Sequence, residues 1–328
     1  MNSIPLVRMR YVDSFAQELN RLGAPVERLL NQVNLSEEML AQRDDFIAVP
    51  QLWRLTALAA EHTGQFDIGF DAGLTPLQEH SQFGQNLVYA PTLHQAFDIF
   101  CKMAPGELTN AEFGLRRDAD TVWFCGGPVY GSSAEQLQVG LYRIAMLIQL
   151  VRWAAGDDWQ PDRIQLQADS LESIESDLLR GARLEFNCAE PAIAAPSALL
   201  GRKLMIAPSS SAFTPGTEAN LSLSFRNSLK EFLRTHIRGH RFHIEQAARA
   251  LDLPVRSLQR ELAEHGLIYS ELVEQTRVEL ASELLQTTHL KIGDIARIVG
   301  YSESTHFSRA FRRVTGNTPR HYRQHLQV

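Results

Sequence analysis

The sequence predicts two domains of different class: an α+β domain over residues 1–206, and an all-α domain over residues 218–328 with two helix-turn-helix units joined by a long helix. Three observations indicate this division. A helical pattern of apolar residues occurs twice in the C-terminal third, and the hydrophobic period changes from helical to extended near Glu107. Residues 207–217 form a Ser/Pro/Gly-rich stretch typical of a flexible linker. A chain of 328 residues is long enough for two hydrophobic cores.

The clearest helical pattern lies in residues 292–314, where two apolar stripes follow each other with the spacing i, i+3, i+4 and i+7. The stripes consist of Ile292, Ile295, Ala296 and Val299, and of Phe307, Ala310, Phe311 and Val314. Between them, Gly300 can end the first helix in the left-handed conformation, Tyr301 is expected to pack back, and Ser302 is expected to cap the second helix. Two short helices joined by such a turn are typical of a helix-turn-helix.

The face of the second helix opposite its apolar stripe is polar. It carries Ser304, Thr305, Ser308, Arg309 and Arg312. These side chains can donate hydrogen bonds to phosphates and base edges. An ordinary helical hairpin with a solvated face would show the same pattern once. The pattern occurs twice, however, and two solvated hairpins have no reason to share a polar face.

The first copy of the pattern lies in residues 244–265. Its apolar residues precede those of the second copy by 48 or 49 positions; they are Ile244, Ala247, Ala248, Leu251, Leu258 and Leu262. In the same register the polar faces align Arg256 with Thr305, Gln259 with Ser308, and Arg260 with Arg309. A helix from Tyr269 to about Leu285 is expected to join the two units and to set their separation.

The charge of the chain changes at the same place. Residues 221–328 hold 16 Lys and Arg against 11 Asp and Glu, a net charge of +5, whereas residues 1–220 carry −11. A basic part that coincides with the repeated helices is the electrostatic footprint of a phosphate-contacting surface. The sequence therefore predicts that the C-terminal domain binds double-stranded DNA. The acidic part would be repelled by DNA and must have another role.

Residues 1–206 are expected to begin with helices and to continue with mixed helices and strands. Helices are predicted at 11–22, 25–33, 50–64, 81–89, 92–103 with Thr92 as its cap, 134–155 and 173–179. Extended segments are predicted at 46–49, 108–116, 121–125, 164–167, 184–186 and 192–195. The second and third of these segments are expected to form a hairpin.

The C-terminal motifs resemble those of the DNA-binding domain of AraC/XylS-type transcription regulators over residues 226–323. The matching residues are Ala247-Ala248, Ser257 to Leu262, Gly266, Arg277, Ala281, Leu284-Leu285, Ile295-Ala296, Gly300-Tyr301, Ser304, His306 to Arg312, Thr315-Gly316, Pro319 and Tyr322-Arg323. The sequence departs from the family at Pro254, where Ser or Thr is usual. The first reading helix therefore lacks a side-chain cap.

This resemblance implies a sequence-specific DNA-binding transcription regulator, with RNA polymerase as a partner and a homodimer as its assembly. It places the base-contacting positions on Arg256, Gln259, Arg260, Ser304, Thr305, Ser308 and Arg309. The chemistry is consistent, since Arg pairs bidentately with guanine, Gln with adenine, and Ser or Thr with several bases. Four further arginines are better suited to phosphate contacts or to ion pairs within the domain: Arg312, Arg313, Arg320 and Arg323.

Residues 20–205 are similar, more weakly, to the arabinose-binding-like N-terminal domain of a subgroup of these regulators. The residues that suggest it include Val49-Pro50, Ile68-Gly69-Phe70, Ala90 to Leu93, Leu184 to Phe186 and Ile193-Ala194. This implies an effector-binding or oligomerisation domain with an unidentified small-molecule effector, because a fold match does not carry a ligand with it. Aromatic residues that either line its pocket or form its core are Trp53, Phe70, Phe83, Tyr89, Phe97, Phe100 and Trp123.

Two other classes of protein remain open from the residues alone. One is an architectural DNA-binding protein without an effector, and the other is a repair-type enzyme with a reactive cysteine fused to such a DNA-binding domain. Cys101, Cys125 and Cys188 lack CxxC or Cys/His spacing, so idle thiols in a reducing cytosol are expected, with no enzymatic activity, metal or cofactor. The sequence shows no signal peptide and no run of about 18 apolar residues. A cytoplasmic protein without membrane contact is expected.

Overall fold

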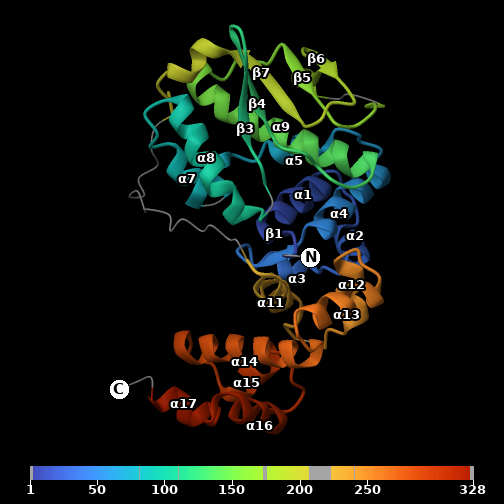
Figure 1. The fold of residues 1–328 in the computed structure, drawn as a ribbon, viewed down its shortest axis with the longest axis vertical. Coiled ribbons are helices and arrows are strands. Elements are labelled where there is room, and N and C mark those ends of the chain that lie inside the picture. The colour runs from blue at the N-terminus through green and yellow to red at the C-terminus, as the bar shows by residue number, and fades with distance from the viewer. Residues whose placement is uncertain are drawn as a thin grey trace. The chain divides into compact units, whose positions relative to one another are not determined.

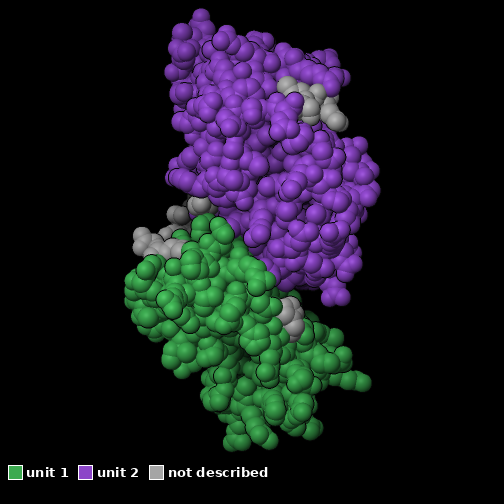
Figure 2. All heavy atoms as spheres, turned by 90° about the vertical axis from the view of Figure 1, so that its right-hand side faces the viewer, with its two compact units in different colours: residues 1–6, 45–48, 223–328 green, residues 7–44, 49–222 purple. Residues whose placement is uncertain are grey.

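The computed structural model describes the chain in six segments, residues 3–80, 82–109, 111–172, 176–206, 223–239 and 241–325. The predicted linker at residues 207–217 lies outside them. The chain forms two compact units, which Figure 2 colours separately. The N-terminal unit consists of Val7–Asp44 and Val49–Ser222, and the C-terminal unit consists of Met1–Leu6, Asp45–Ala48 and Leu223–Val328.

The N-terminal unit is of the predicted α+β class and combines helices with a five-stranded sheet (Figure 1). Its helices are α1 (Met9–Arg21), α2 (Val26–Gln32), α3 (Glu37–Leu40), α4 (Val49–Thr63), α5 (Ile68–Gly73), α6 (Leu77–His80), α7 (Gln82–Leu87), α8 (Leu93–Glu107), α9 (Ser133–Ala155), α10 (Asp177–Arg180) and the 3-10 helix η1 (Ser197–Gly201). Within the described segments, no helix has both the length and the apolar character needed to cross a bilayer.

The sheet has the strand order β3-β4-β7-β5-β6. Its strands are β3 (Gly114–Asp118), β4 (Thr121–Cys125), β5 (Arg163–Gln165), β6 (Arg183–Glu185) and β7 (Ala192–Pro196). Neighbouring strands pair antiparallel except β5 and β6, which are parallel. The predicted hairpin is confirmed, with Asp118 opposite Thr121. Its first strand begins six residues later than predicted, after helix α8 has continued to Glu107 instead of ending near Met103.

Helix α9 is the central element of this unit. A capping box starts it, in which the Ser132 hydroxyl accepts from the Glu135 amide and the Glu135 carboxylate accepts from the Ser132 amide. Most of its 23 residues are apolar and buried on all sides, which is typical of a helix enclosed by other elements. It packs against α4, α5, α8 and β7, and Figure 1 shows it between the sheet and α5.

Helix α5, which the sequence pattern did not predict, crosses α9 through two glycines. A Cβ on Gly69 would lie 2.2 Å from the carbonyl oxygen of Gln138, and a Cβ on Gly73 would lie 2.6 Å from the carbonyl oxygen of Tyr142. The Gln138 side chain supports this crossing, because it accepts from the Gly69 amide at 2.9 Å and donates to the Phe66 carbonyl at 3.0 Å. The close approach of the two backbones therefore requires glycine.

Gly69→Ala is expected to destabilise the N-terminal unit by about 1–3 kcal/mol, because the added carbon would force two packed backbones apart. Urea unfolding followed by tryptophan fluorescence measures this unit, since it contains all 4 tryptophans of the chain. Gly114→Ala is the control, because nothing lies within 4 Å of the carbon added there. Equal unfolding midpoints for Gly69→Ala and the wild-type protein would contradict this crossing.

Other predictions for the N-terminal unit hold in part. The Thr92 side chain caps α8 as predicted and accepts from the Gln95 amide at 3.3 Å. Leu22 ends the helix predicted at 11–22, but α1 ends at Arg21, and Leu22 lies beyond it and is exposed. Of the helix predicted at residues 173–179, positions 173–175 lie outside the described segments, and α10 begins at Asp177.

The C-terminal unit is helical in its described residues from 223 onward, as predicted. Its helices are α11 (Phe225–His236), α12 (Ile244–Ala250), α13 (Val255–Glu264), α14 (Tyr269–Thr287), α15 (Ile292–Ile298), α16 (Ser304–Thr315) and α17 (Pro319–His325). The two predicted helix-turn-helix units are confirmed as α12–α13 and α15–α16, and α14 is the long helix that joins them. Helix α17 was not predicted.

Two segments from the start of the chain also belong to the C-terminal unit, although the sequence division places them in the first domain. They contribute to a two-stranded sheet of β1 (Leu6–Arg8) and β2 (Phe46–Ala48). Helix α11 bonds to both segments: the Ile4 amide donates to Ser228 Oγ at 2.9 Å, and Thr235 Oγ1 donates to the Phe46 carbonyl at 2.7 Å. Both bonds are buried, so these segments form part of the core around α11.

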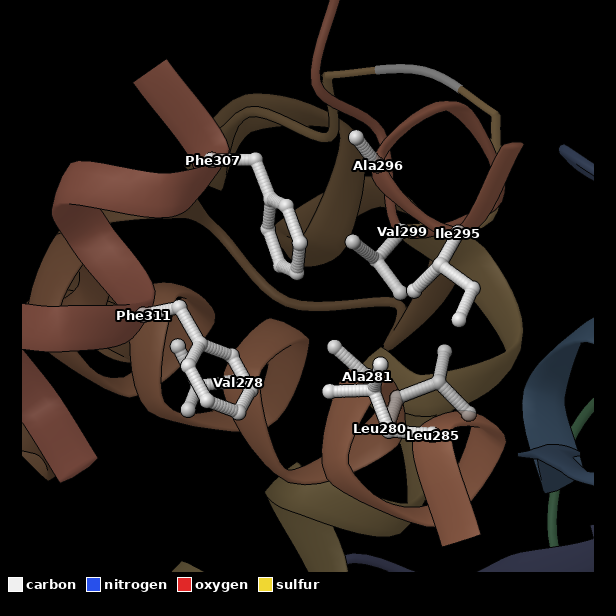
Figure 3. Packing of buried hydrophobic residues seen from close by; sticks show 9 residues of the cluster. All are labelled: Val278, Leu280, Ala281, Leu285, Ile295, Ala296, Val299, Phe307 and Phe311. Atoms are coloured by element: carbon white, nitrogen blue, oxygen red, sulfur yellow. The ribbon is translucent and has the colours of Figure 1, made fainter. Parts of the chain in front are cut away.

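The second helix-turn-helix unit is built around an apolar cluster from α14, α15 and α16 (Figure 3). Phe307 and Phe311 project from α16 into the space between these helices, with ring centroids 5.6 Å apart. Ile295 and Val299 of α15 complete the cluster, and all four side chains are fully buried as the predicted stripes require. Val314, the last residue of the predicted stripe, is instead 45% exposed because it lies beyond the cluster.

Candidate nucleic-acid interface

The turn of each helix-turn-helix unit contains a left-handed residue. It is Gly300 (φ +82°) in the second unit and Asp252 (φ +54°), 48 positions earlier, in the first. Glycine adopts this conformation without steric cost, and aspartate tolerates it through local hydrogen bonding. Tyr301 packs back on Phe307 as predicted, with ring centroids 5.6 Å apart. Ser302 is not the cap of α16, because the helix begins one residue later, after Glu303, and no side chain caps it.

Helix α13 presents the three predicted base-reading residues of the first unit to solvent: Arg256, Gln259 and Arg260. Leu258 and Leu262 on the opposite face are buried and fix the rotation of the helix about its axis. Pro254 precedes the helix without a side-chain cap, as the departure from the family pattern predicts. The polar face of α13 is therefore oriented by the buried leucines on the opposite face and not by a side-chain cap.

Helix α16 presents Ser304, Thr305 and Arg309 to solvent. The Thr305 hydroxyl donates to the Glu303 carboxylate at 3.2 Å. Ser308 is half-buried, and its hydroxyl donates to the Ser304 carbonyl at 2.8 Å. The Ser308 oxygen is thus left with its lone pairs, so in this arrangement it can accept from a base but not donate to one.

The arginines of the C-terminal unit divide into two groups. The first group is exposed and has no ion pair with another described residue; it consists of Arg241, Arg249, Arg256, Arg309, Arg312 and Arg320. The second group bonds within the unit: Arg313 pairs with Glu274 of α14, and Arg323 donates to the Leu290 carbonyl at 2.7 Å. Of the four predicted phosphate contacts, Arg313 has an ion-pair partner and Arg323 is bonded to a neutral carbonyl, whereas Arg312 and Arg320 are exposed and form no bond with another described residue.

Helices α11 and α14, which precede the two helix-turn-helix units, run side by side. Three polar pairs link them, Arg226 with Gln275, Lys230 with Glu279 and Arg234 with Glu283. Each partner lies 49 positions further along the chain, the same offset that relates α13 to α16. Later residues of α11 pair with later residues of α14, so the two helices run parallel. The internal repeat thus extends to the helix before each unit, which the apolar pattern did not reveal.

A cavity of about 50 Å³ lies in the N-terminal unit between α1, α4, α8 and α9. Trp53 and Phe100 are the members of the predicted aromatic set that line it, among the side chains that the structure describes. Phe70, Phe97 and Trp123 are buried elsewhere, Tyr89 is half-buried away from the cavity, and the side chain of Phe83 lies outside the described residues. The predicted aromatic set therefore does not surround a single cavity.

Sequence reasoning missed two charged residues that line this cavity, Glu107 of α8 and Arg143 of α9. The signal for Arg143 was its position inside the most apolar helix of the chain, where a charge is unfavourable unless it has a partner. Glu107 ends a helix and gives no comparable signal.

The three cysteines are free thiols. Burial raises the pKa of Cys101 and of Cys125 to about 12. The pKa of Cys188 is also raised, by partial burial and by the nearby Glu185 carboxylate. Because the thiolate is the reactive form, all three thiols are poor nucleophiles near neutral pH.

Two helix-turn-helix units in one basic module, each with an exposed polar face, define a DNA-binding protein of the helix-turn-helix class. Comparisons with known proteins agree. The family described as the arabinose-binding domain of AraC transcription regulators matches residues 23–204, more than half of the chain, and a helix-turn-helix domain family matches residues 247–325. The chain belongs to the AraC family of transcription regulators, with an N-terminal domain of the arabinose-binding type.

Relatives of the chain are themselves regulators. The Ornithine utilization regulator of Pseudomonas aeruginosa is 42% identical over 81 residues, which cover 25% of this chain and 24% of that protein. The transcriptional activator RhaS of an Enterobacter species is 28% identical over 169 residues, 51% of this chain and 59% of RhaS. The chain thus spans less than two thirds of either relative. The crystal structure of CdpR from Pseudomonas aeruginosa matches 96% of this chain and 98% of its own, with 20% identity and a TM-score of 0.43.

Proposed function

We propose that this protein regulates transcription by reading two adjacent stretches of operator DNA with α13 and α16, under the control of a small molecule bound by the N-terminal unit. The observation that carries this proposal is the pair of exposed polar faces at equivalent positions of the two helix-turn-helix copies. Their base readers would be Arg256, Gln259 and Arg260 on α13, and Ser304, Thr305, Ser308 and Arg309 on α16. Arg312 and Arg320 would contact phosphates.

The joining helix supports the reading of two major grooves by one chain. Helix α14 has 19 residues and is therefore about 28 Å long. Successive major grooves on one face of DNA lie about 34 Å apart. If the two reading helices are closer than that, the DNA bends toward the protein, and the sequences that bend easily are favoured. A homodimer on a two-fold symmetric operator and contact with RNA polymerase complete the proposal.

The N-terminal unit is proposed to act as a sensor rather than as an enzyme. The protonated state of its cysteines supports this, because alkyl transfer to a cysteine requires a thiolate. The protein has one arrangement when it is bound to DNA and another when it is free. A ligand of this unit changes DNA binding only if it binds one of these two arrangements more tightly than the other. The cavity lined by Trp53 and Arg143 is the proposed place for this ligand.

Arg260→Ala is expected to weaken binding to the operator by about 1–3 kcal/mol and to relax the preference at one base pair. Its ion pair with Glu264 joins two exposed side chains, so the substitution has little effect on folding. The operator is obtained by selection from random duplexes with the full-length protein, and affinities are measured by fluorescence anisotropy at several salt concentrations. An equal loss of affinity for the selected and the random duplex would exclude base reading by Arg260.

The matched control is Arg312→Ala, which replaces an exposed arginine of the second unit. A phosphate contact carries no sequence information, so both duplexes should bind less tightly by the same factor. The slope of log affinity against log salt should decrease by about 1. A loss confined to the selected duplex would assign Arg312 to base reading instead.

A further inference from the structure

The cavity of the N-terminal unit contains a buried positive charge. Arg143 extends from α9, is 5% exposed and lines the cavity. Its Nη1 donates to the carbonyl oxygens of Gly126 and Gly127 at 2.7 and 2.8 Å. Its guanidinium carbon lies 5.8 Å from the ring centroid of Phe113. These contacts hold the guanidinium group in one orientation and engage one of its three nitrogens.

The other two nitrogens of Arg143 have no partner among the described residues. No carboxylate there forms an ion pair with Arg143, and no acceptor bonds to Nε or Nη2. Burial alone lowers the pKa of this guanidinium to about 10, with no anion to offset it. Buried charges in proteins are normally paired. The Nε and Nη2 edge offers parallel N–H groups that match the two oxygens of a carboxylate.

The second charged residue of the cavity wall does not favour a cationic ligand. Glu107 Oε2 lies 3.6 Å from Nε of Arg10, which also pairs with Asp44, so Glu107 already has a cationic partner within the unit. The neighbouring phenols of Tyr11 and Tyr142 remain neutral, because burial raises the pKa of each. The charge in this cavity that lacks a counterion is therefore positive.

The remaining wall favours an apolar body on the ligand. It includes the rings of Phe15, Phe100 and Phe113 and is otherwise mainly aliphatic. A sugar would leave most of its hydroxyl groups without partners in such a cavity, which is unfavourable. The volume of about 50 Å³ is several times the roughly 10–15 Å³ that one water molecule requires, so the cavity suits a small organic molecule.

We propose that this cavity binds a small apolar monocarboxylic acid, whose carboxylate pairs with Nε and Nη2 of Arg143 and whose body packs against Tyr11, Trp53 and Phe100. This inference rests on the proposed function, because the acid would be the effector of the regulator. It differs from the sugar that the name of the domain family suggests.

The test titrates the full-length protein with phenylacetate and octanoate, and with the neutral amides phenylacetamide and octanamide. Tryptophan fluorescence reports binding, since Trp53 lines the cavity, and thermal unfolding confirms binding to the native state. At least one acid should bind about 10- to 100-fold more tightly than its amide, because bonds to charged groups are stronger. The two acids separate an aromatic from an aliphatic ligand. Equal binding of acid and amide, or no binding of either acid at millimolar concentration, would overturn the proposal.

Two variants locate the site. Arg143→Gln should abolish the preference for acid over amide. Because Arg143 also holds Gly126 and Gly127, Val139→Phe provides a second variant that keeps this arginine and fills the cavity from α9. A folded Val139→Phe protein, verified by circular dichroism, should no longer bind the acid. Wild-type affinity in that variant would place the acid elsewhere and refute the site.

DNA binding separates a failure of this proposal from a failure of the proposed function. If neither acid binds but the protein still selects and binds an operator, the ligand class is wrong and the regulator function stands. If an acid binds through Arg143 without changing operator affinity, the site stands and effector control fails. The expected result is an acid-dependent change in operator affinity that Arg143→Gln abolishes.

Discussion

Phe307→Ala is expected to destabilise the second helix-turn-helix unit by about 3–5 kcal/mol. Phe307 is fully buried, and its ring centroid lies 5.6 Å from those of Tyr301 and Phe311. Its removal opens a cavity where α14, α15 and α16 meet (Figure 3). Helix α16 would then lose the contacts that orient it, and the exposed Arg309 would no longer be held in position for DNA. We expect both stability and operator binding to fall.

Hydrogen exchange in the full-length protein measures this effect, because the amides of α14 to α16 exchange faster when the unit opens more often. Val314→Ala is the matched control on the same helix. Val314 is 45% exposed, so its truncation should change the free energy of opening by no more than about 0.5 kcal/mol. If Phe307→Ala retained the wild-type protection of α15 and α16, the apolar cluster would not be what holds the reading helix.

The two helix-turn-helix units were predictable from the sequence because their determinants are local. Stripes of apolar residues at helical spacing fix which face is buried, and Gly300 marks the turn through its left-handed conformation. Each of these signals lies within about 25 residues. The duplication of the pattern then distinguishes a functional surface from an ordinary solvated face. The charge of the two halves is also a property of composition and needs no structure.

The cavity could not be predicted, because it depends on residues far apart in the chain. Tyr11, Trp53, Phe100 and Arg143 come from four helices, and nothing in their spacing brings them together. The same holds for Gly69 and Gln138, whose contact sets the crossing of α5 and α9. An aromatic residue at helical spacing looks the same whether it lines a cavity or fills a core. This is why Phe97, stacked on Phe100 with ring centroids 5.9 Å apart, was a candidate although it lies in the core.

The three polar pairs between α11 and α14 show that the internal repeat includes these two helices. The spacing of apolar residues does not reveal this part of the repeat. Arg234 and Glu283 are both polar and lie on helix surfaces, so neither marks a core position. Their common offset with the other two pairs becomes visible only when the helices are placed side by side. Exposed pairs of this kind contribute little stability, but three in register fix how the two copies lie against each other.

Combined replacement of Arg256, Gln259 and Arg260 by alanine is expected to reduce affinity for the complete operator by about 10²–10⁴-fold. Two binding modules in one compact unit behave as a bivalent ligand, since binding of one places the other at high local concentration over its half of the site. When the base contacts of α13 are removed, the protein retains only the affinity that α16 provides. The three side chains are exposed on α13 and the buried leucines of that helix remain, so the unit should stay folded.

The comparison that isolates this effect uses a second duplex in which the half-site of α13 is replaced by random sequence. The wild-type protein should bind this duplex about as weakly as the triple variant binds the complete operator, and the triple variant should bind both duplexes alike. This result would show that the lost affinity comes from the contact between the α13 side chains and their half-site, because removal of either one has the same effect as removal of both. An equal loss of affinity on both duplexes would mean that α13 contributes only non-specific contacts, and that α16 alone carries the sequence preference.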